Sequence, residues 1–184
     1  MTHLISNSTK ITIIVAILFA SFSGQAQKKV HIISNTTIDA SVQDVYDLIK
    51  NYERFPEWSP FLVSDPNQKN HVTGNNGELG SVFHWEGVDE KSLDYQTLTE
   101  VTQNEYAKMD CTVQKPFKAN STFEYFITET PQGVEVRQEF ITEMKGFSYF
   151  MAKLFGMEKE IAATNKLGLD RLKSVLETGL TSKL

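Results

Sequence analysis

Alternating apolar and polar positions dominate the middle of the chain and predict a β-sheet. Such alternation, rich in β-branched and aromatic residues, is typical of strands that bury one face. Short turn-forming segments separate consecutive stretches, which predicts an antiparallel meander. The predicted strands are residues 28–39, 79–87, 92–101, 105–113, 119–128 and 134–144. The Asn- and Gly-rich segment 67–80 is expected to be a loop.

Helical spacing replaces the alternation in two places. Residues 42–51 carry one apolar face, and Asp39 or Ser41 precedes them as a capping residue. Residues 147–178 carry a longer apolar stripe, in which Gly156 predicts a kink between a short helix and a long last helix. A long helix with one apolar face must bury it, and the concave side of the sheet is the natural partner.

The stretch NYERFPEWSPF, residues 51–61, places four aromatic residues and two prolines in eleven positions. Pro56 and Pro60 prevent a long helix, so we expect only a short helical turn between them. We interpret Phe55, Trp58 and Phe61 as the end wall of an internal apolar space. The open alternative is that these rings only fill the junction between helix and sheet.

Strand alternation sorts the side chains that face inward. An apolar face with a few orienting polar groups is typical of a small-molecule pocket. A solidly packed core would show the same pattern, so this alternative stays open. The predicted ligand-binding residues are Phe55, Trp58, Phe61, Phe83, Trp85, Met109, Phe123, Tyr125, Gln138, Phe140, Phe150 and Leu154.

Charge and cysteine content narrow the classes of function. The formal net charge of the 184 residues is -5, without a basic cluster, which argues against a nucleic-acid partner. The single cysteine, Cys111, excludes an intramolecular disulfide and is interpreted as a small core residue. The composition and length of the chain favour a globular protein, in which residues 28–179 form a single domain.

The first 26 residues differ from the rest of the chain. Lys10 precedes the apolar run Ile11–Phe22, and small residues follow up to Ala26. This order is typical of an export signal peptide, cut after Ala26, which predicts a periplasmic or secreted protein. The run is short for a membrane span, which needs about 20 apolar residues. An uncleaved N-terminal anchor is the alternative.

The sequence offers few candidates for catalytic chemistry. His84 and Glu86 share one strand face, interpreted as the solvated outer face; inward placement would allow an acid–base role. Asp110, Glu124, Arg137 and Glu139 are expected on that outer face, with cross-strand ion pairs between Arg137 and a glutamate. No metal-ligand spacing, nucleotide loop or nucleophile motif is present, so no cofactor, metal or catalytic residue is predicted.

Residues 147–157, FSYFMAKLFGM, are the most apolar part of the chain after the leader. Three interpretations remain open for this segment. It gates the mouth of an internal space, it contacts a membrane transiently when exposed, or it is a buried first helix.

The order of elements, together with three motifs, resembles the START-like, Bet v 1-like SRPBCC superfamily of polyketide cyclase/dehydrase-like proteins. The motifs are IDASVQDVYDLIKNYERFPEWSPF, GSVFHWEG and GMEKEIAATNKLGLDRLKSVLE. The resemblance covers essentially everything after the leader. It implies an α+β helix-grip fold, with a curved antiparallel sheet of about six to seven strands wrapped round a long C-terminal helix and two short helices after the first strand.

The resemblance also implies an apolar tunnel between the sheet and the last helix. The favoured hypothesis is an exported binding protein that holds a small apolar or lipid-like molecule there. The alternative is a polyketide cyclase/dehydrase-type enzyme acting on an apolar substrate in the same cavity. Catalysis needs an inward titratable group, and the assigned faces place only Tyr125 and Cys111 there. A protein-interaction module, like the chaperone-activating relatives, is the third possibility, and the oligomeric state is left open.

Overall fold

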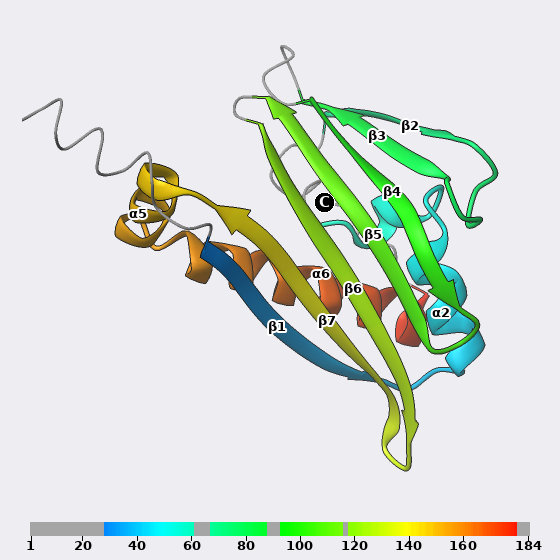
Figure 1. Cartoon of the computed structure of the whole chain (residues 1–184). Coiled ribbons are helices and arrows are strands. Elements are labelled where there is room, and N and C mark those ends of the chain that lie inside the picture. The colour runs from blue at the N-terminus through cyan, green and yellow to red at the C-terminus, as the bar shows by residue number, and fades with distance from the viewer. Residues whose placement is uncertain (1–27, 61–66, 88–92, 116–117, 180–184) are drawn as a thin grey trace, which may run out of the picture.

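A computed structural model describes residues 28–60, 67–87, 93–115 and 118–179. Seven antiparallel strands form one sheet in the order β1-β7-β6-β5-β4-β3-β2, which Figure 1 shows from its outer side. The strands are β1 (Lys28–Ile38), β2 (Lys69–Thr73), β3 (Val82–Glu86), β4 (Leu93–Thr102), β5 (Tyr106–Lys115), β6 (Ala119–Thr130) and β7 (Gly133–Met144). From β2 to β7, strands that are consecutive in sequence pair with each other. The first strand, β1, pairs with β7 and forms the other edge of the sheet.

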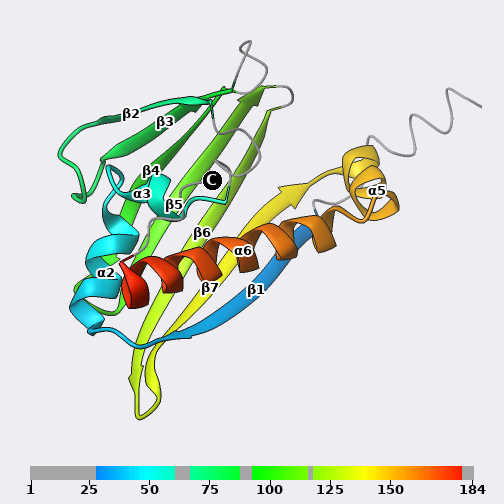
Figure 2. The ribbon, with the colours of Figure 1, turned by 180° about the vertical axis from the view of Figure 1, so that it is seen from behind.

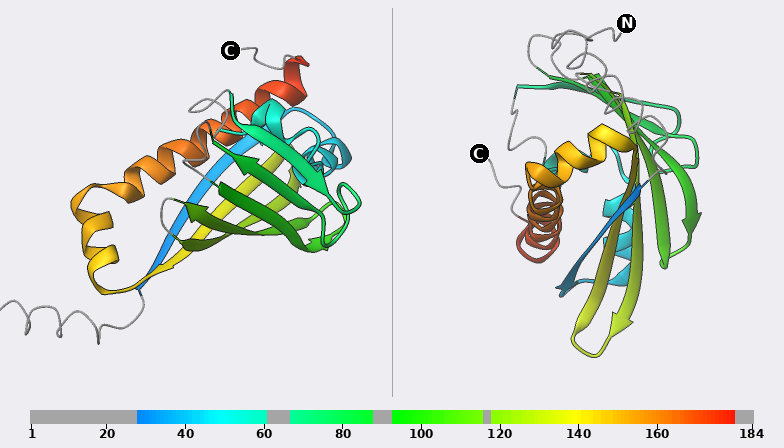
Figure 3. Two further views of the ribbon diagram at one scale, coloured as in Figure 1. Left: turned by 90° about the horizontal axis from the view of Figure 1, so that it is seen from above. Right: turned by 60° about the vertical axis from the view of Figure 1, so that its left-hand side comes forward.

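The helices lie on one side of this sheet, as Figure 2 shows. They are α2 (Val42–Lys50), α3 (Phe55–Trp58), α5 (Gly146–Leu154) and α6 (Met157–Thr178). The sheet is strongly bent, and α6 runs along its hollow side (Figure 3). This arrangement is the predicted helix-grip fold. Within the described residues, no helix combines the length and apolar character that a membrane span requires.

Local sequence explains where the helices begin and separate. The Ser41 hydroxyl accepts a hydrogen bond from the Asp44 backbone N–H at 3.1 Å, which caps α2 as predicted. Gly156 adopts the left-handed conformation, with φ of 67°, and separates α5 from α6. The kink predicted at Gly156 is therefore confirmed. Gly168, by contrast, lies within an unbroken α6.

Two details of the predicted strands are wrong. Residues Lys69–Thr73, expected in a loop, form β2, an edge strand that pairs only with β3. Its side chains are mostly exposed, so it carries no apolar alternation that would reveal it. The next strand begins at Val82 and not at Leu79, whose side chain is 60% exposed in the preceding turn.

The inward faces of the central strands are as the alternation predicts. The Met109, Tyr125 and Val136 side chains are buried on β5, β6 and β7, in one core with the apolar faces of α2 and α3. The α6 helix joins this core mainly through its C-terminal half, and nearer its N-terminus only the partly buried Ile161 packs against the apolar core. Its buried residues are Asn165, Gly168, Leu169, Leu172 and Val175. The C-terminal part of α6 is therefore packed against the core far more extensively than its N-terminal part.

The opposite face of the sheet carries ion pairs, but not the cross-strand pair that was expected for Arg137. Glu139 accepts from Arg137 on its own strand, and it lies 2.6 Å from the Nε2 atom of His31 on β1. The pairing of Arg137 therefore runs along β7 and not across strands. Its guanidinium also lies 4.1 Å from the ring centroid of Phe126 on β6. Partly exposed pairs of this kind contribute about 0–1 kcal/mol each.

Gly133 marks a tight approach where the β6–β7 turn meets the end of β1. Its φ is 125°, and a Cβ atom there would lie 2.6 Å from the Ile38 carbonyl oxygen. Both the backbone conformation and this contact exclude a side chain. Gly80 also has positive φ, at 85°, but a Cβ atom there would meet nothing within 4 Å.

We predict that Gly133→Ala lowers the free energy of unfolding by at least about 2 kcal/mol, because strain and a backbone clash add. Gly80→Ala is the matched control, since it carries the strain without the clash, and should cost about 1 kcal/mol. Urea unfolding followed by circular dichroism measures both. Equal losses for the two variants would contradict the proposed contact with β1.

Candidate functional site

The aromatic residues of the stretch 51–61 that the structure describes form a wall between sheet and helix. Pro56 sits in the first turn of α3, where a missing N–H costs nothing, and the short helix turns Phe55 and Trp58 inward. Their rings meet edge to face at 4.8 Å between centroids. Phe55 also meets Phe83 of β3 at 5.0 Å, and Trp58 meets Tyr125 of β6 at 6.2 Å. The stretch therefore joins α3 to the sheet.

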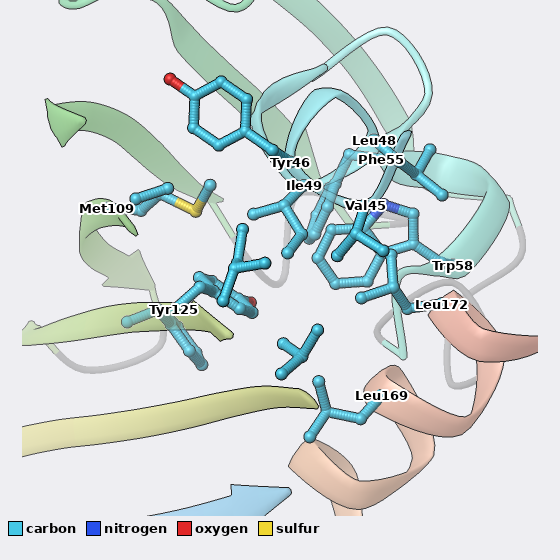
Figure 4. Close-up of a cluster of buried hydrophobic side chains, with 14 of the residues drawn as sticks. Val45, Tyr46, Leu48, Ile49, Phe55, Trp58, Met109, Tyr125, Leu169 and Leu172 are labelled. Atoms are coloured by element: carbon cyan, nitrogen blue, oxygen red, sulfur yellow. The ribbon is translucent and has the colours of Figure 1, made fainter. Parts of the chain in front are cut away.

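A small cavity lies where this wall meets α6, and we call it the α6 cavity. Its volume is about 10 Å³, which is about the space that one water molecule requires. The described residues therefore do not show the open apolar tunnel that the family resemblance implies. Figure 4 shows side chains of α3, α6 and β6 converging in this part of the core. The described residues that line the cavity are Phe55, Trp58, Pro60, Gln96, Phe123, Tyr125, Gln138, Asn165 and Gly168.

Polar atoms at the α6 cavity lack part of their hydrogen bonding. The Gln138 side-chain amide donates to the Tyr125 hydroxyl at 2.8 Å. The Gln138 Oε1 atom, the Trp58 Nε1 atom and the Asn165 Nδ2 atom are buried and have no partner. A buried polar group without a partner costs about 1–3 kcal/mol. The site therefore holds two donors and one acceptor that a bound molecule could satisfy.

The lining carries no charged side chain among the described residues. Burial raises the pKa of the Tyr125 hydroxyl well above its usual value, and the hydrogen bond from Gln138 opposes this shift. Burial also raises the pKa of the Cys111 thiol to about 12. Both groups are therefore neutral near pH 7, and Cys111 is not an activated nucleophile.

The sequence matches the family model described as "Polyketide cyclase / dehydrase and lipid transport" over residues 29–177. This match covers most of the chain. The chain belongs to this family. A comparison with curated proteins found no match. Family membership agrees with the superfamily resemblance of the three motifs, and the family description points to hydrophobic or lipid-like ligands as a class.

Solved structures share the family fold at low sequence identity. A Staphylococcus aureus protein of unknown function aligns with a TM-score of 0.64 and 13% identity, over 83% of this chain and 96% of that one. Truncated norcoclaurine synthase from Thalictrum flavum aligns with a TM-score of 0.59 and 12% identity, over 84% and 97%. The Aha1 dimer from Colwellia psychrerythraea gives 0.55 and 15%, over 82% and 98%. At such identities the likeness establishes the fold alone.

The structure brings most of the predicted site residues of this family member together. Five of them line the α6 cavity: Phe55, Trp58, Phe123, Tyr125 and Gln138. Four more are buried in the surrounding core: Phe83, Trp85, Met109 and Phe140. Phe61 lies outside the described residues. Phe150 and Leu154 lie exposed on α5, apart from the others.

Two polar lining residues were missed by the sequence analysis. Gln96 lies on the inward face of β4 between Asp94 and Leu98, so the alternation of that strand would have revealed it. Asn165 follows Ile161 and precedes Leu169 by four residues each, which places it in the buried stripe of α6. Both were missed because they stand among apolar neighbours, and Gln138 was the only amide side chain assigned to the interior.

Asp94 is a third omission and is the titratable carboxyl of the inner wall. It is buried on β4 and accepts hydrogen bonds from the Gln114 backbone N–H, at 3.2 Å, and from the Trp85 indole. Burial nevertheless raises the pKa of its carboxyl above the usual value. The expectation that only Tyr125 and Cys111 titrate inside is therefore incomplete.

The outer face offers two further features. His84 lies there, as expected, with its ring stacked on that of His71 at 4.6 Å, and it shares a hydrogen bond with Thr73 at 3.0 Å. Burial and the neighbouring His71 lower the pKa of His84. Among the described residues, no three metal-binding side chains come together. The histidine pair is therefore a surface contact between β2 and β3.

An open hollow of about 1010 Å³ also lies over the ends of β5, β6 and β7. Its lining includes Asp110, to which the Thr122 hydroxyl donates at 3.1 Å, and Lys118. Polar side chains predominate, and the hollow lies open to solvent. It lacks the enclosed apolar walls that an apolar ligand requires.

We predict that Asp94→Asn changes how stability depends on pH. Because the folded-state pKa of Asp94 is raised, the folded protein binds this proton more tightly than the unfolded chain. The protonated Asp94 carboxyl stabilises the folded wild-type protein fully below the unfolded pKa of about 3.9, and this stabilisation is lost as pH rises through the higher folded pKa. The variant should therefore gain stability relative to wild type between about pH 4 and about pH 7.

Urea unfolding of both proteins at the two pH values measures this difference. Asp170→Asn is a suitable control, because that carboxyl lies half-exposed on α6 beside Lys166. A stability difference that is constant, or that moves the other way, would show that Asp94 is not held in a desolvated site.

Proposed function

We propose that this protein binds a small apolar or lipid-like molecule between the sheet and α6, with an uncharged polar head group at the α6 cavity. The observation that carries the proposal is the convergence of unpartnered, buried polar atoms of Trp58, Gln138 and Asn165 on one cavity. Natural interiors rarely retain such atoms without a role. The surrounding walls are apolar, which suits the rest of the ligand.

The chemistry of the lining selects the head group. The indole N–H of Trp58 and the amide of Asn165 would donate to an oxygen atom, and Gln138 would accept from a hydroxyl or N–H group. No described lining residue could neutralise a charge, and burying an unpaired charge is very costly. A hydroxyl, amide or carbonyl group therefore fits better than a carboxylate or ammonium group.

Space for the apolar part requires α6 to shift. The helix is fixed at Gly168, where a Cβ atom would lie 3.3 Å from the Pro60 ring, and by Leu169 and Leu172. The residues of α6 that precede Asn165 are exposed or only partly buried. Ligand access therefore requires the N-terminal half of α6 to move away from the sheet, while the C-terminal half stays in place.

The family description includes lipid transport, which supports a binding role. It also includes cyclase and dehydrase activity, and one structural relative is named as a synthase. An enzyme of that type acting on an apolar substrate is the second candidate, and buried Asp94 favours it because its raised pKa suits proton transfer. We retain export as part of the proposal, with the leader cut after Ala26.

The first experiment asks whether a ligand exists and which head group it carries. We expect native extraction and mass spectrometry to recover a neutral amphiphile. A fluorescent long-chain alcohol should bind at least about tenfold more tightly than the matching fatty acid at neutral pH, because only the acid must bury a charge. Repeatedly empty preparations together with equal or reversed affinities would refute the proposal.

The second experiment separates binding from folding through Asn165→Ala. Without ligand, the variant should be as stable as wild type or about 1 kcal/mol more stable, because an unpartnered polar group is removed. Its affinity for the long-chain alcohol should fall about fivefold with the lost hydrogen bond. Ser81→Ala is the matched control, since Ser81 Oγ is also buried and unpartnered but does not line the cavity. An equal loss of affinity in both variants would contradict the assignment.

A further inference from the structure

An exposed apolar cluster lies at the end of the molecule where α5 meets α6. Figure 3 shows α5 at the extreme end of the fold, beyond the body of the sheet. The exposed fractions are 51% for Phe150, 64% for Leu154, 70% for Phe155 and 41% for Met157. We call these four residues the apolar tip. Only three other large apolar side chains in the described chain are comparably exposed: Ile33, Leu79 and Leu167.

The tip is one face of an amphipathic arrangement. Phe150 and Leu154 are four residues apart on α5, so their side chains share a face. Ala152 lies on the other side of the helix and is buried. The helix is thus packed against the protein through one face and presents the larger side chains outward. The nine residues of α5 are too few to span a bilayer, so a membrane could receive it only in the interfacial plane.

Lysines flank the tip, together with Glu143 and with Glu158 and Glu160 in the first turn of α6, in a chain whose net charge is -5. Lys145 and Lys153 are exposed at the two ends of α5, and residues 144–157 contain no acidic residue. Lys28 is also exposed and pairs in register with Met144, which places the start of β1 beside α5. Lys29 follows it, opposite Glu143. Lysines around an exposed apolar face complement an anionic lipid surface, since their stems lie along the apolar region and their ammonium groups contact phosphates.

Until the proposed cut after Ala26, the course of the chain favours the same partner. Residues 1–27, which include the apolar run Ile11–Phe22, precede Lys28 and therefore join the described structure at the α5 end. We infer that the apolar tip docks on the surface of an anionic phospholipid bilayer. This inference goes beyond the proposed function, and it holds whether or not the α6 cavity takes a ligand.

Docking would also orient the molecule. Gly156 joins α5 directly to the N-terminal half of α6, the part of that helix with few buried residues. A docked tip therefore places the loosely held half of α6 next to the lipid surface. A ligand that enters past this half would exchange directly with the bilayer.

The test uses residues 27–184, which contain all described elements and the complete family match. The same region aligns with 96% of the Staphylococcus aureus protein and 97% of truncated norcoclaurine synthase, so it holds the elements of the shared fold. Flotation with vesicles of phosphatidylglycerol and phosphatidylcholine, compared with pure phosphatidylcholine vesicles, measures docking without the leader. We expect clear binding to the anionic vesicles and weak binding to the neutral ones.

Two double variants and one control locate the surface. Leu154→Ser with Phe155→Ser should reduce binding to anionic vesicles about tenfold or more, because the exposed apolar area is lost. Lys145→Gln with Lys153→Gln should reduce it about tenfold on anionic vesicles only. The control pairs Ile33→Ser with Leu79→Ser, whose side chains are 51% and 60% exposed elsewhere, and should bind as wild type does. Circular dichroism confirms that all variants fold.

Three results would overturn the inference. Wild-type protein could ignore both vesicle types. The tip variants and the control could bind equally well. Vesicle binding could be absent while sedimentation reveals a wild-type dimer that the Leu154 and Phe155 changes abolish. That result would assign the tip to contact between copies of this chain.

Discussion

The seating of α6 against the sheet is the interaction on which the rest of the structure depends. Gly168 allows the helix backbone to approach Pro60 closely, and Leu169 and Leu172 beside it are fully buried. This contact holds α3 and its aromatic residues between helix and sheet. Without it, the inner face of the sheet would expose its apolar side chains, and the polar atoms at the α6 cavity would have no common enclosure.

The fold was largely predictable because burial on one face imposes a period on the sequence. Alternation located β4 to β7 and the inward side chains of β5 to β7, and helical spacing located α2 and the kink at Gly156. β2 could not be found in this way, since an exposed edge strand buries neither face and its sequence is free to resemble a loop. The site was predicted less completely, because Gln96, Asn165 and Asp94 follow the same periods as their apolar neighbours but have polar side chains.

In the proposed function, stability and ligand binding depend on the same few atoms. The polar groups of Trp58, Gln138 and Asn165 reduce the stability of the unliganded protein, because burial removes them from water without a replacement partner. Away from the α6 cavity, Tyr52 Oη, Ser81 Oγ and Arg171 Nε are also buried without a partner, whereas the carboxyl of Asp94 has two donors. A local excess of unsatisfied groups within an otherwise apolar core is the expected mark of a site adapted to something other than stability.

The unequal anchoring of α6 has a geometric consequence. If α6 stays packed at Gly168 while its N-terminal end at Met157 moves away from the sheet, a wedge-shaped space opens between helix and sheet. This space is narrow near Gly168 and wide near Met157. The narrow part of such a wedge would discriminate between ligands by their hydrogen-bonding chemistry, whereas the wide part would tolerate differences in hydrocarbon length and branching. One binding space would then be selective for the head group of the ligand at one end of α6 and tolerant of its hydrocarbon part at the other end.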